Sequence, residues 1–299
     1  MQKPSYLSLY KSGEMDNRIV RLNKILELCT LCPRRCEINR LQGETGYCQA
    51  GSAVMVSSYF PHFGEERPLV GKSGSGTIFL THCNLRCNFC QNYNISHLGA
   101  GEIITPRKLA QLMLQLQLQG CYNINFVTPT HYISQIISAL PLAIEIGLEV
   151  PIVYNCGGYE SLEVIELLDG IVDIYMPDAK FSNSTYAESY ANAPDYFEVL
   201  KAVLKEMHRQ VGVLKTENGI GYRGMLIRHL VMPNDVAGSE NILRFIAEKL
   251  STKSYVNIMS QYRPCFEAED DSIINRRISS KEYYQAIELA KKFGLSRGF

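Results

Sequence analysis

Short apolar segments alternate with longer helical segments from Gly76 to the end of the chain. The apolar segments have the length of strands, and six strands are expected, at residues 77–80, 123–127, 152–154, 171–176, 225–231 and 256–259. A segment of helical character follows each of them. This alternation predicts an α/β protein built around a parallel sheet. Periodicity alone leaves two architectures open, an open doubly wound sheet and a partly closed barrel.

The first expected helix has the clearest signals. Thr105 suits the N-cap, Pro106 fits the first turn, and Gly120 stands where the chain must leave the helix. The apolar side chains of this helix are expected to cover the sheet, and they are Leu109, Leu112, Met113 and Leu116. Later helices are expected at residues 133–146, 161–168, 196–211, 240–250 and 281–293.

Polar residues gather directly after the expected strands. They lie at residues 128–131, 155–158, 177–180, 228–229 and 260–262. A single Asn or Gly after a strand usually only makes a turn, and Asp178 with Lys180 could be an ordinary ion pair. The carboxyl ends of parallel strands, however, meet at one rim of the fold. Several polar groups at that rim together predict a ligand site.

Composition sets the broad class. The chain has 299 residues, of which 46% are hydrophobic and 20% charged, enough for one large domain or for a domain with a small module. Thirty basic and 30 acidic residues cancel, so the net charge gives no evidence for a nucleic-acid or membrane partner. No segment has the apolar length of a secretory leader or a membrane span. A cytoplasmic protein is therefore expected.

Three cysteines in the segment that follows the first expected strand give the strongest chemical signal. Cys83, Cys87 and Cys90 form a C-x3-C-x2-C motif, and their thiolates can converge on one iron–sulfur cluster. A cubane cluster held by only three cysteines leaves one iron free for another ligand. Structural zinc is the alternative, but it takes four ligands, and His82 adjoins Cys83 too closely to complete a relaxed tetrahedron. The motif therefore predicts a 4Fe-4S cluster with an open iron.

A second cysteine group precedes the barrel-like part of the chain. Its spacing is C-x2-C-x3-C-x11-C, and its members are Cys29, Cys32, Cys36 and Cys48. Buried free thiols are one interpretation, although short loops offer little core. Structural zinc and a second 4Fe-4S cluster are equally compatible with four thiolates. Residues 1–70 are thus expected to form a small metal-binding module with a linker, and residues 71–299 the main domain.

The three-cysteine motif resembles that of the radical S-adenosylmethionine (SAM) enzymes, and Phe89 matches the aromatic residue that commonly precedes their third cysteine. The resemblance implies that SAM binds the open iron. It also implies that an electron from the cluster cleaves SAM to methionine and a 5'-deoxyadenosyl radical, which abstracts hydrogen from a substrate. The implied fold is a (β/α)6 partial TIM barrel whose first strand leads into the cysteine loop.

Within that superfamily, residues 60–299 are most similar to the activating enzymes of glycyl radical enzymes. The similarity lies in residues 74–79, 90–92, 154–158, 173–180 and 228–233. It implies that SAM contacts Asn155, Asp178, Lys180 and Arg228, and that Phe89 lies against the adenine. Those enzymes hold the methionine amino group with a Gly-Gly-Glu motif after the second strand, where this chain has Thr128, Pro129 and Thr130. Thr128 or Thr130 is expected to take over that contact.

The expected function is a radical SAM oxidoreductase that abstracts hydrogen from a substrate, for which a protein glycine is one candidate. The alternatives are an enzyme that modifies a peptide or small molecule, and a non-catalytic scaffold that binds the cluster and SAM. The resemblance implies an electron donor such as flavodoxin or ferredoxin. No catalytic residue is assigned. The linker at residues 61–66 brings His62, Glu65 and Glu66, which either meet the barrel mouth or lie in solvent.

Overall fold

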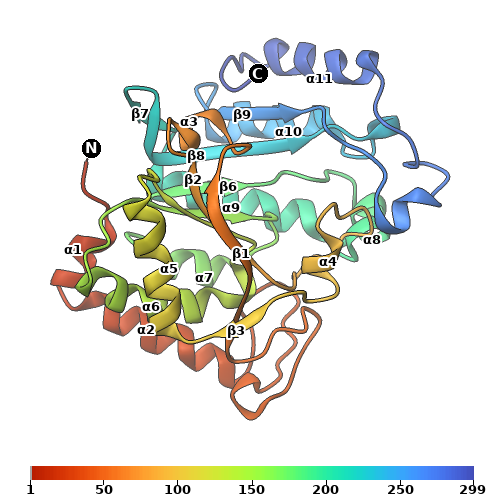
Figure 1. The fold of residues 1–299 in the computed structure, drawn as a ribbon. Helices are drawn as coiled ribbons and strands as arrows, with labels where there is room; N and C mark the ends of the chain where they lie inside the picture. Colours follow the sequence, from red (N-terminus) through yellow and green to blue (C-terminus); the bar gives the residue numbers. More distant parts are fainter. Residues whose placement is uncertain (1) are drawn as a thin grey trace.

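The computed structural model describes residues 2–299 and has six parallel strands at its centre. The strands are paired in the order β2 (Ser75–Leu80), β4 (Ile124–Val127), β5 (Ile152–Cys156), β6 (Ile174–Pro177), β8 (Ile220–Leu230) and β9 (Tyr255–Met259). These are the six strands that the sequence predicts. The α/β class with a parallel sheet is confirmed, and the strand order is compatible with a partial TIM barrel (Figure 1).

Three further strands extend the sheet and were not predicted. Strand β1 (Val54–His62) runs antiparallel to β2 and also pairs with β3 (Glu102–Ile104). Strand β7 (Lys215–Glu217) forms a hairpin with β8. Because of that hairpin, β8 begins at Ile220 and not at the expected Met225. The sequence signal of β1 is weak because a register shift between Val56 and Ser58 interrupts the alternation of its side chains.

Helices cover the sheet and connect its strands (Figure 1). Helix α5 (Pro106–Leu118) begins as predicted, since the Thr105 side chain accepts a hydrogen bond from the Lys108 amide. The other helices along the barrel are α6 (Ile133–Glu145), α7 (Leu162–Leu167), α8 (Ser184–Ala191), α9 (Tyr196–Val211), α10 (Ser239–Phe245) and α11 (Ser280–Lys292). The expected helix over 240–250 changes after Phe245 to a π-helical turn, η5 (Ile246–Leu250). No helix within residues 2–299 is long and apolar enough to cross a bilayer.

The N-terminal residues pack on the barrel. Helices α1 (Tyr6–Lys11) and α2 (Glu14–Lys24) bury Tyr6, Met15 and Leu22 in the core shared with the barrel helices. The Ser5 amide donates to Asp173 next to β6 at 2.9 Å. The packing of α1, α2 and β1 is therefore continuous with the barrel, and the boundary after residue 70 stays a prediction. Irregular chain with the short 3-10 turns η1 (Ile25–Glu27) and η2 (Arg40–Gln42) carries the first four cysteines.

A short helix closes the barrel interior near the amino-terminal ends of the strands. Leu69 of α3 (Arg67–Val70) is fully buried in an apolar cluster with Val153, Ile174, Met176, Leu214 and Leu226. Asn123, just before β4, donates to the Leu69 carbonyl at 2.8 Å. The short elements at the opposite end are α4 (Tyr93–Ser96), η3 (Thr130–Tyr132), η4 (Pro233–Asp235) and η6 (Phe266–Glu269). Buried polar side chains at the amino-terminal end, such as Ser75 and Asn123, bond one another and the α3 backbone.

Candidate active site

The cysteine loop follows β2 and folds back on itself. Two of its residues, His82 and Arg86, adopt left-handed backbone angles with φ of 65° and 48°, which turn the chain on either side of Cys83. The Leu85 amide lies 3.4 Å from the Cys83 sulfur, and the Ser96 hydroxyl in α4 lies 3.2 Å from the Cys90 sulfur. These contacts turn the loop so that all three cysteines line one cavity of about 260 Å³.

Burial favours the protonated form of two thiols in this loop, those of Cys83 and Cys87. Burial raises the pKa of Cys83 to about 11. Burial also raises the pKa of Cys87, against the opposing effect of the nearby Lys180 ammonium group. Only the thiolate form binds iron, so metal loading at this site must release protons.

Four polar residues from three adjacent strand ends form one ion-paired network. Asp178, after β6, accepts hydrogen bonds from Lys180 Nζ at 2.6 Å and from Arg228 Nε at 2.7 Å. Arg228, in β8, also donates to Asn155 Oδ1 in β5 at 2.7 Å. Burial alone would raise the pKa of Asp178, but Arg228 and Lys180 outweigh it and hold that pKa below its ordinary value. Asp178 is therefore an ionised anchor between two cations.

The remaining predicted SAM contacts line the same cavity. Phe89 packs edge-on against Phe181, with ring centres 5.9 Å apart. Thr128 has a left-handed backbone with φ of 58°, and its amide donates to the Asn155 carbonyl at 2.8 Å. The cavity wall thus contains every predicted contact, namely Phe89, Thr128, Asn155, Asp178, Lys180 and Arg228, together with the three cysteines.

Thr130, the other candidate for the amino-group contact, lies elsewhere. It is fully buried, and its hydroxyl donates to Glu160 at 3.0 Å. Tyr154 donates to the same carboxylate at 2.8 Å. Thr130 is thus part of a buried network beneath the rim, and of the two threonines only Thr128 lines the cavity.

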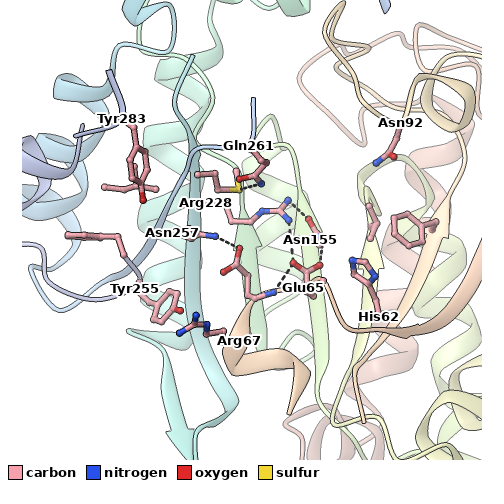
Figure 2. Close-up of a pocket in the computed structure, with 18 residues that line it drawn as sticks. His62, Glu65, Arg67, Asn92, Asn155, Arg228, Tyr255, Asn257, Gln261 and Tyr283 are labelled. Carbon is pink, nitrogen blue, oxygen red and sulfur yellow. Dashed lines mark hydrogen bonds and ion pairs between the residues drawn. The ribbon is translucent and has the colours of Figure 1, made fainter. Parts of the chain in front are cut away.

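A larger cavity of about 1050 Å³ adjoins the first and contains the two linker acids (Figure 2). Glu65 accepts from Asn125 at 2.8 Å and lies 3.6 Å from Arg228 NH1. Glu66 accepts from Asn257 at 2.7 Å, and burial raises its pKa. The two linker acids thus face the barrel interior and not solvent, and they reach it from the amino-terminal side of β2, next to α3. The two cavities share part of their walls, formed by Phe79, Asn92, Val127, Asn155, Arg228, Met259 and Gln261.

Two site residues in the strands were missed by sequence analysis. Asn125 lies between Ile124 and Phe126 in β4, and Asn257 lies between Val256 and Ile258 in β9. A polar residue at every second position of an apolar strand points to a polar surface on one face of the sheet. That local signal was available, but it does not reveal that the partners of these amides are Glu65 and Glu66.

The N-terminal cysteine loop lies against the loop of Cys83. Arg34 Nε donates to the Asn84 carbonyl at 3.0 Å, and the Tyr47 hydroxyl donates to the Leu85 carbonyl at 3.3 Å. The Arg34 guanidinium also stacks 4.0 Å above the Tyr47 ring. Among residues 2–299, no three His, Cys, Asp or Glu side chains are grouped as the ligands of one metal ion. In a cubane cluster, by contrast, each thiolate binds a different iron, so the thiolates lie farther apart than the ligands of a single ion.

A parallel α/β barrel with a three-cysteine loop after its first parallel strand and a polar cavity beside it defines a class of cluster-dependent enzymes. The chain belongs to the radical SAM superfamily, whose sequence model matches residues 77–233. It is thus a radical enzyme of the kind that cleaves SAM, and the superfamily implies a 4Fe-4S cluster, SAM and a source of electrons. The closer resemblance to glycyl radical activating enzymes is not confirmed by the match and stays a prediction.

Individual relatives are similar over most of the chain. An uncharacterized protein of Methanocaldococcus jannaschii is 33% identical over 97% of this chain and 82% of its own length. A second uncharacterized protein of that organism is 24% identical over 81% of this chain and 72% of its own length. Among solved structures, methylornithine synthase matches with a TM-score of 0.48 and 12% identity, over 72% of this chain and 62% of the synthase.

The residues around the smaller cavity fit both superfamily cofactors. Three thiols on one wall are the soft ligands that iron–sulfur clusters require. Lys180 and Arg228 supply cations for a carboxylate, and Asn155 and Thr128 supply groups that can bond hydroxyl and amino groups. The donor set therefore suits a zwitterionic nucleoside cofactor beside a cluster.

Proposed function

We propose that Cys83, Cys87 and Cys90 hold a 4Fe-4S cluster and that the adjoining cavity holds SAM. The observation that carries this proposal is the convergence of the three cysteines with all six predicted SAM contacts on the wall of one cavity. When bound, the two cofactors supply a carbon-centred radical that abstracts a hydrogen atom from the substrate.

Each residue has a distinct role in this proposal. Asp178 fixes Lys180 and Arg228 by the two short ion pairs, so that neither cation must reorganise when a carboxylate binds. Asn155, held by Arg228, and the Thr128 hydroxyl serve the ribose and amino groups. Phe89 provides an apolar surface for the adenine, because its ring is already packed against Phe181 and Tyr262.

The larger cavity is the proposed substrate site. It shares a wall with the SAM cavity at Asn155 and Arg228, so a substrate there lies directly beside the cofactor. Its amide side chains, from Asn92, Asn257 and Gln261, can both donate to and accept from a peptide backbone. We therefore propose that the substrate is an extended protein segment and that a glycine in it loses the hydrogen atom. A flavodoxin or ferredoxin is the proposed electron donor.

Anaerobic reconstitution with iron and sulfide tests the cofactor assignment. The loaded protein, mixed with SAM and a strong reductant, is expected to form 5'-deoxyadenosine, and Cys87→Ala is expected to abolish this. Cys121→Ala is the matched control, because Cys121 is equally buried but bonds only the Ser73 carbonyl. Deoxyadenosine formation that survives in Cys87→Ala would refute the assignment.

Isotope transfer tests the substrate class separately. Extract from cells grown on α-deuterated glycine is divided into a dialysed macromolecular fraction and a diffusible fraction, and each is added to the reaction. Deuterium in 5'-deoxyadenosine from the macromolecular fraction is expected. Deuterium transferred only from the diffusible fraction would contradict a protein substrate and leave the SAM chemistry intact.

A further inference from the structure

The four N-terminal cysteines form one side of a small enclosed cavity. Two backbone hydrogen bonds between Cys29 and the 37–38 segment close the loop, at 2.9 and 3.1 Å. Gly46 lies so close to Cys36 that a Cβ at this position would stand 2.7 Å from the Cys36 sulfur. The loop thus places the four thiols on the wall of one cavity, although no three of them in the described residues are grouped around the position of a single ion. The polar wall of the cavity consists of Cys29, Cys32, Cys36, Cys48, Arg40 and His131, with Arg34 at its edge.

Arg40 contributes a buried positive charge to this cavity. Its side chain is 1% exposed, and its guanidinium donates to two backbone carbonyls, those of Gly51 and His131. Within residues 2–299, no carboxylate forms an ion pair with it. A buried charge without a counter-ion is costly. An anionic group inside the cavity, which Arg40 lines, would balance this charge.

His131 contributes a buried nitrogen without a partner. Its Nε2 lies 2.8 Å from the Thr81 carbonyl, which can only accept, so Nε2 carries the proton. The other ring nitrogen, Nδ1, is then a bare acceptor, and it has no hydrogen-bond partner among the described residues. His131 is 1% exposed and lines the same cavity as the cysteines. Histidines near metals commonly donate their other N–H to a backbone carbonyl in this way.

We propose that Cys29, Cys32, Cys36 and Cys48 bind one thiolate-coordinated metal centre, with Arg40 as its buried counter-charge and His131 Nδ1 in its wall. Four thiolates give the centre a net negative charge whether the metal is zinc or a 4Fe-4S cluster. That charge satisfies Arg40, which no carboxylate does. The inference goes beyond the proposed SAM chemistry and does not depend on it.

The proposed centre also braces the catalytic loop. His131 bonds Thr81, just before Cys83, while Arg34 and Tyr47 bond the carbonyls of Asn84 and Leu85, just after it. The N-terminal loop thus holds the backbone after Cys83, and His131 of η3, which lines the same cavity, holds the backbone before it. A metal that fixes the N-terminal loop would also fix the hydrogen bonds from Arg34 and Tyr47 to the Cys83 loop. A redox-active metal at this site would lie next to the loop that is proposed to hold the SAM cluster.

Metal analysis in a background that lacks the SAM cluster tests the site. Full-length protein with Cys83, Cys87 and Cys90 all changed to Ala is purified and reconstituted anaerobically. We expect about four iron and four sulfide with visible absorbance, or about one zinc without it. Either result supports the centre and identifies its metal. Adding Cys32→Ala and Cys48→Ala should remove that metal, and equal metal contents in the two variants would overturn the proposal.

The same two substitutions are also made in the otherwise unchanged chain, as a control for misfolding of the protein that lacks Cys83, Cys87 and Cys90. There, Cys32→Ala with Cys48→Ala should lower the total metal by the same amount. No decrease, in a protein with unchanged circular dichroism, would also overturn the proposal.

Two substitutions of Arg40 separate the effect of its charge from the effect of its size. Arg40→Met removes the charge at similar length, and we expect transfer of the metal to a chelator to become at least about tenfold faster. Arg40→Lys keeps the charge and should stay close to wild type. If the metal is a cluster, Arg40→Met should also lower its reduction potential. Equal transfer rates for all three proteins would refute the counter-charge role of Arg40.

Discussion

Arg228 Nε donates to Asp178 Oδ1 at 2.7 Å and so joins the carboxyl ends of two neighbouring parallel strands. The carboxylate is 16% exposed and the guanidinium 17%, so water screens the pair only partly. The second oxygen of Asp178 binds Lys180, and the second arm of Arg228 reaches Asn155. One carboxylate therefore fixes three of the other polar groups proposed to contact SAM.

Asp178→Asn should impair SAM binding without removing the cluster. The substitution keeps the shape but leaves Lys180 without its anion and Arg228 with only Glu65, 3.6 Å away. We therefore expect at least about tenfold weaker SAM binding and a loss of about 3 kcal/mol in stability. Isothermal titration with SAM measures the affinity, and iron content reports the cluster. Asp169→Asn is the control, because Asp169 pairs with Arg209 at the surface. An unchanged isotherm would remove Asp178 from the cofactor site.

Arg34→Met should loosen the contact between the two cysteine loops. Arg34 donates to the carbonyls of Asn84, Ala191 and Asn192, and hydrogen bonds from a charged donor contribute about 1.5–3 kcal/mol each. We expect a lower melting temperature and faster loss of deoxyadenosine formation during incubation with an iron chelator. The control is Arg209→Met, which removes only surface contacts. Equal inactivation rates would show that Arg34 does not support the catalytic loop.

Leu69→Ala should destabilise the closed end of the barrel. Leu69 is fully buried among five apolar side chains from four neighbouring segments, so its truncation leaves a cavity and should cost about 2–5 kcal/mol. The melting temperature at equal iron content measures the loss. Leu118→Ala is the control, because Leu118 is 76% exposed and should change stability by less than about 0.5 kcal/mol. Similar melting temperatures for both variants would contradict the packing described.

Glu160 should make stability depend on pH. Burial raises the pKa of its carboxyl to about 7, above the unfolded value, so the folded state holds the proton more tightly. Stability from this group is greatest at low pH and is lost as the pH rises through about 7. Between about pH 6 and pH 8 the loss should be about 1 kcal/mol.

Melting temperatures of wild type and Glu160→Gln across this pH range check that prediction. The glutamine keeps an acceptor for Tyr154 and Thr130 and does not titrate, so its curve should be flatter than that of wild type. Parallel curves for the two proteins would exclude Glu160 as the source of the pH dependence.

Local signals were sufficient for the six parallel strands and for the side chains that line the smaller cavity. The Cys83 motif is contiguous in sequence, and Asp178, Lys180 and Arg228 each follow or end an apolar strand. Because parallel strands end at one rim, their convergence could be predicted without knowing any distance. Helix α2 was not predicted, although its Met15, Ile19 and Leu22 have the i, i+4, i+7 spacing of an amphipathic helix.

Contacts between distant segments could not be predicted in this way. Glu65 and Arg228 form an ion pair although they are 163 positions apart in the sequence. Arg40 donates to the His131 carbonyl although these residues are 91 positions apart. Neither pair leaves a periodic or spaced pattern, because each depends on how the chain before β2 wraps around the finished barrel. The linker acids could be proposed as candidates, but their partners required the structure.

The pairing of β1 with β2 has a consequence for the kinetics of ligand entry. Strand β2 bonds β1 on one edge and β4 on the other, so it has no free edge with which β9 could close the cylinder. The larger cavity is lined from both sides of this gap, by His62 and Phe79 on one side and by Tyr255 and Asn257 on the other (Figure 2). A lateral entrance is thus a permanent part of the fold. If the larger cavity is the substrate site, as proposed, we expect association to need no opening motion and its rate to be set by diffusion and orientation.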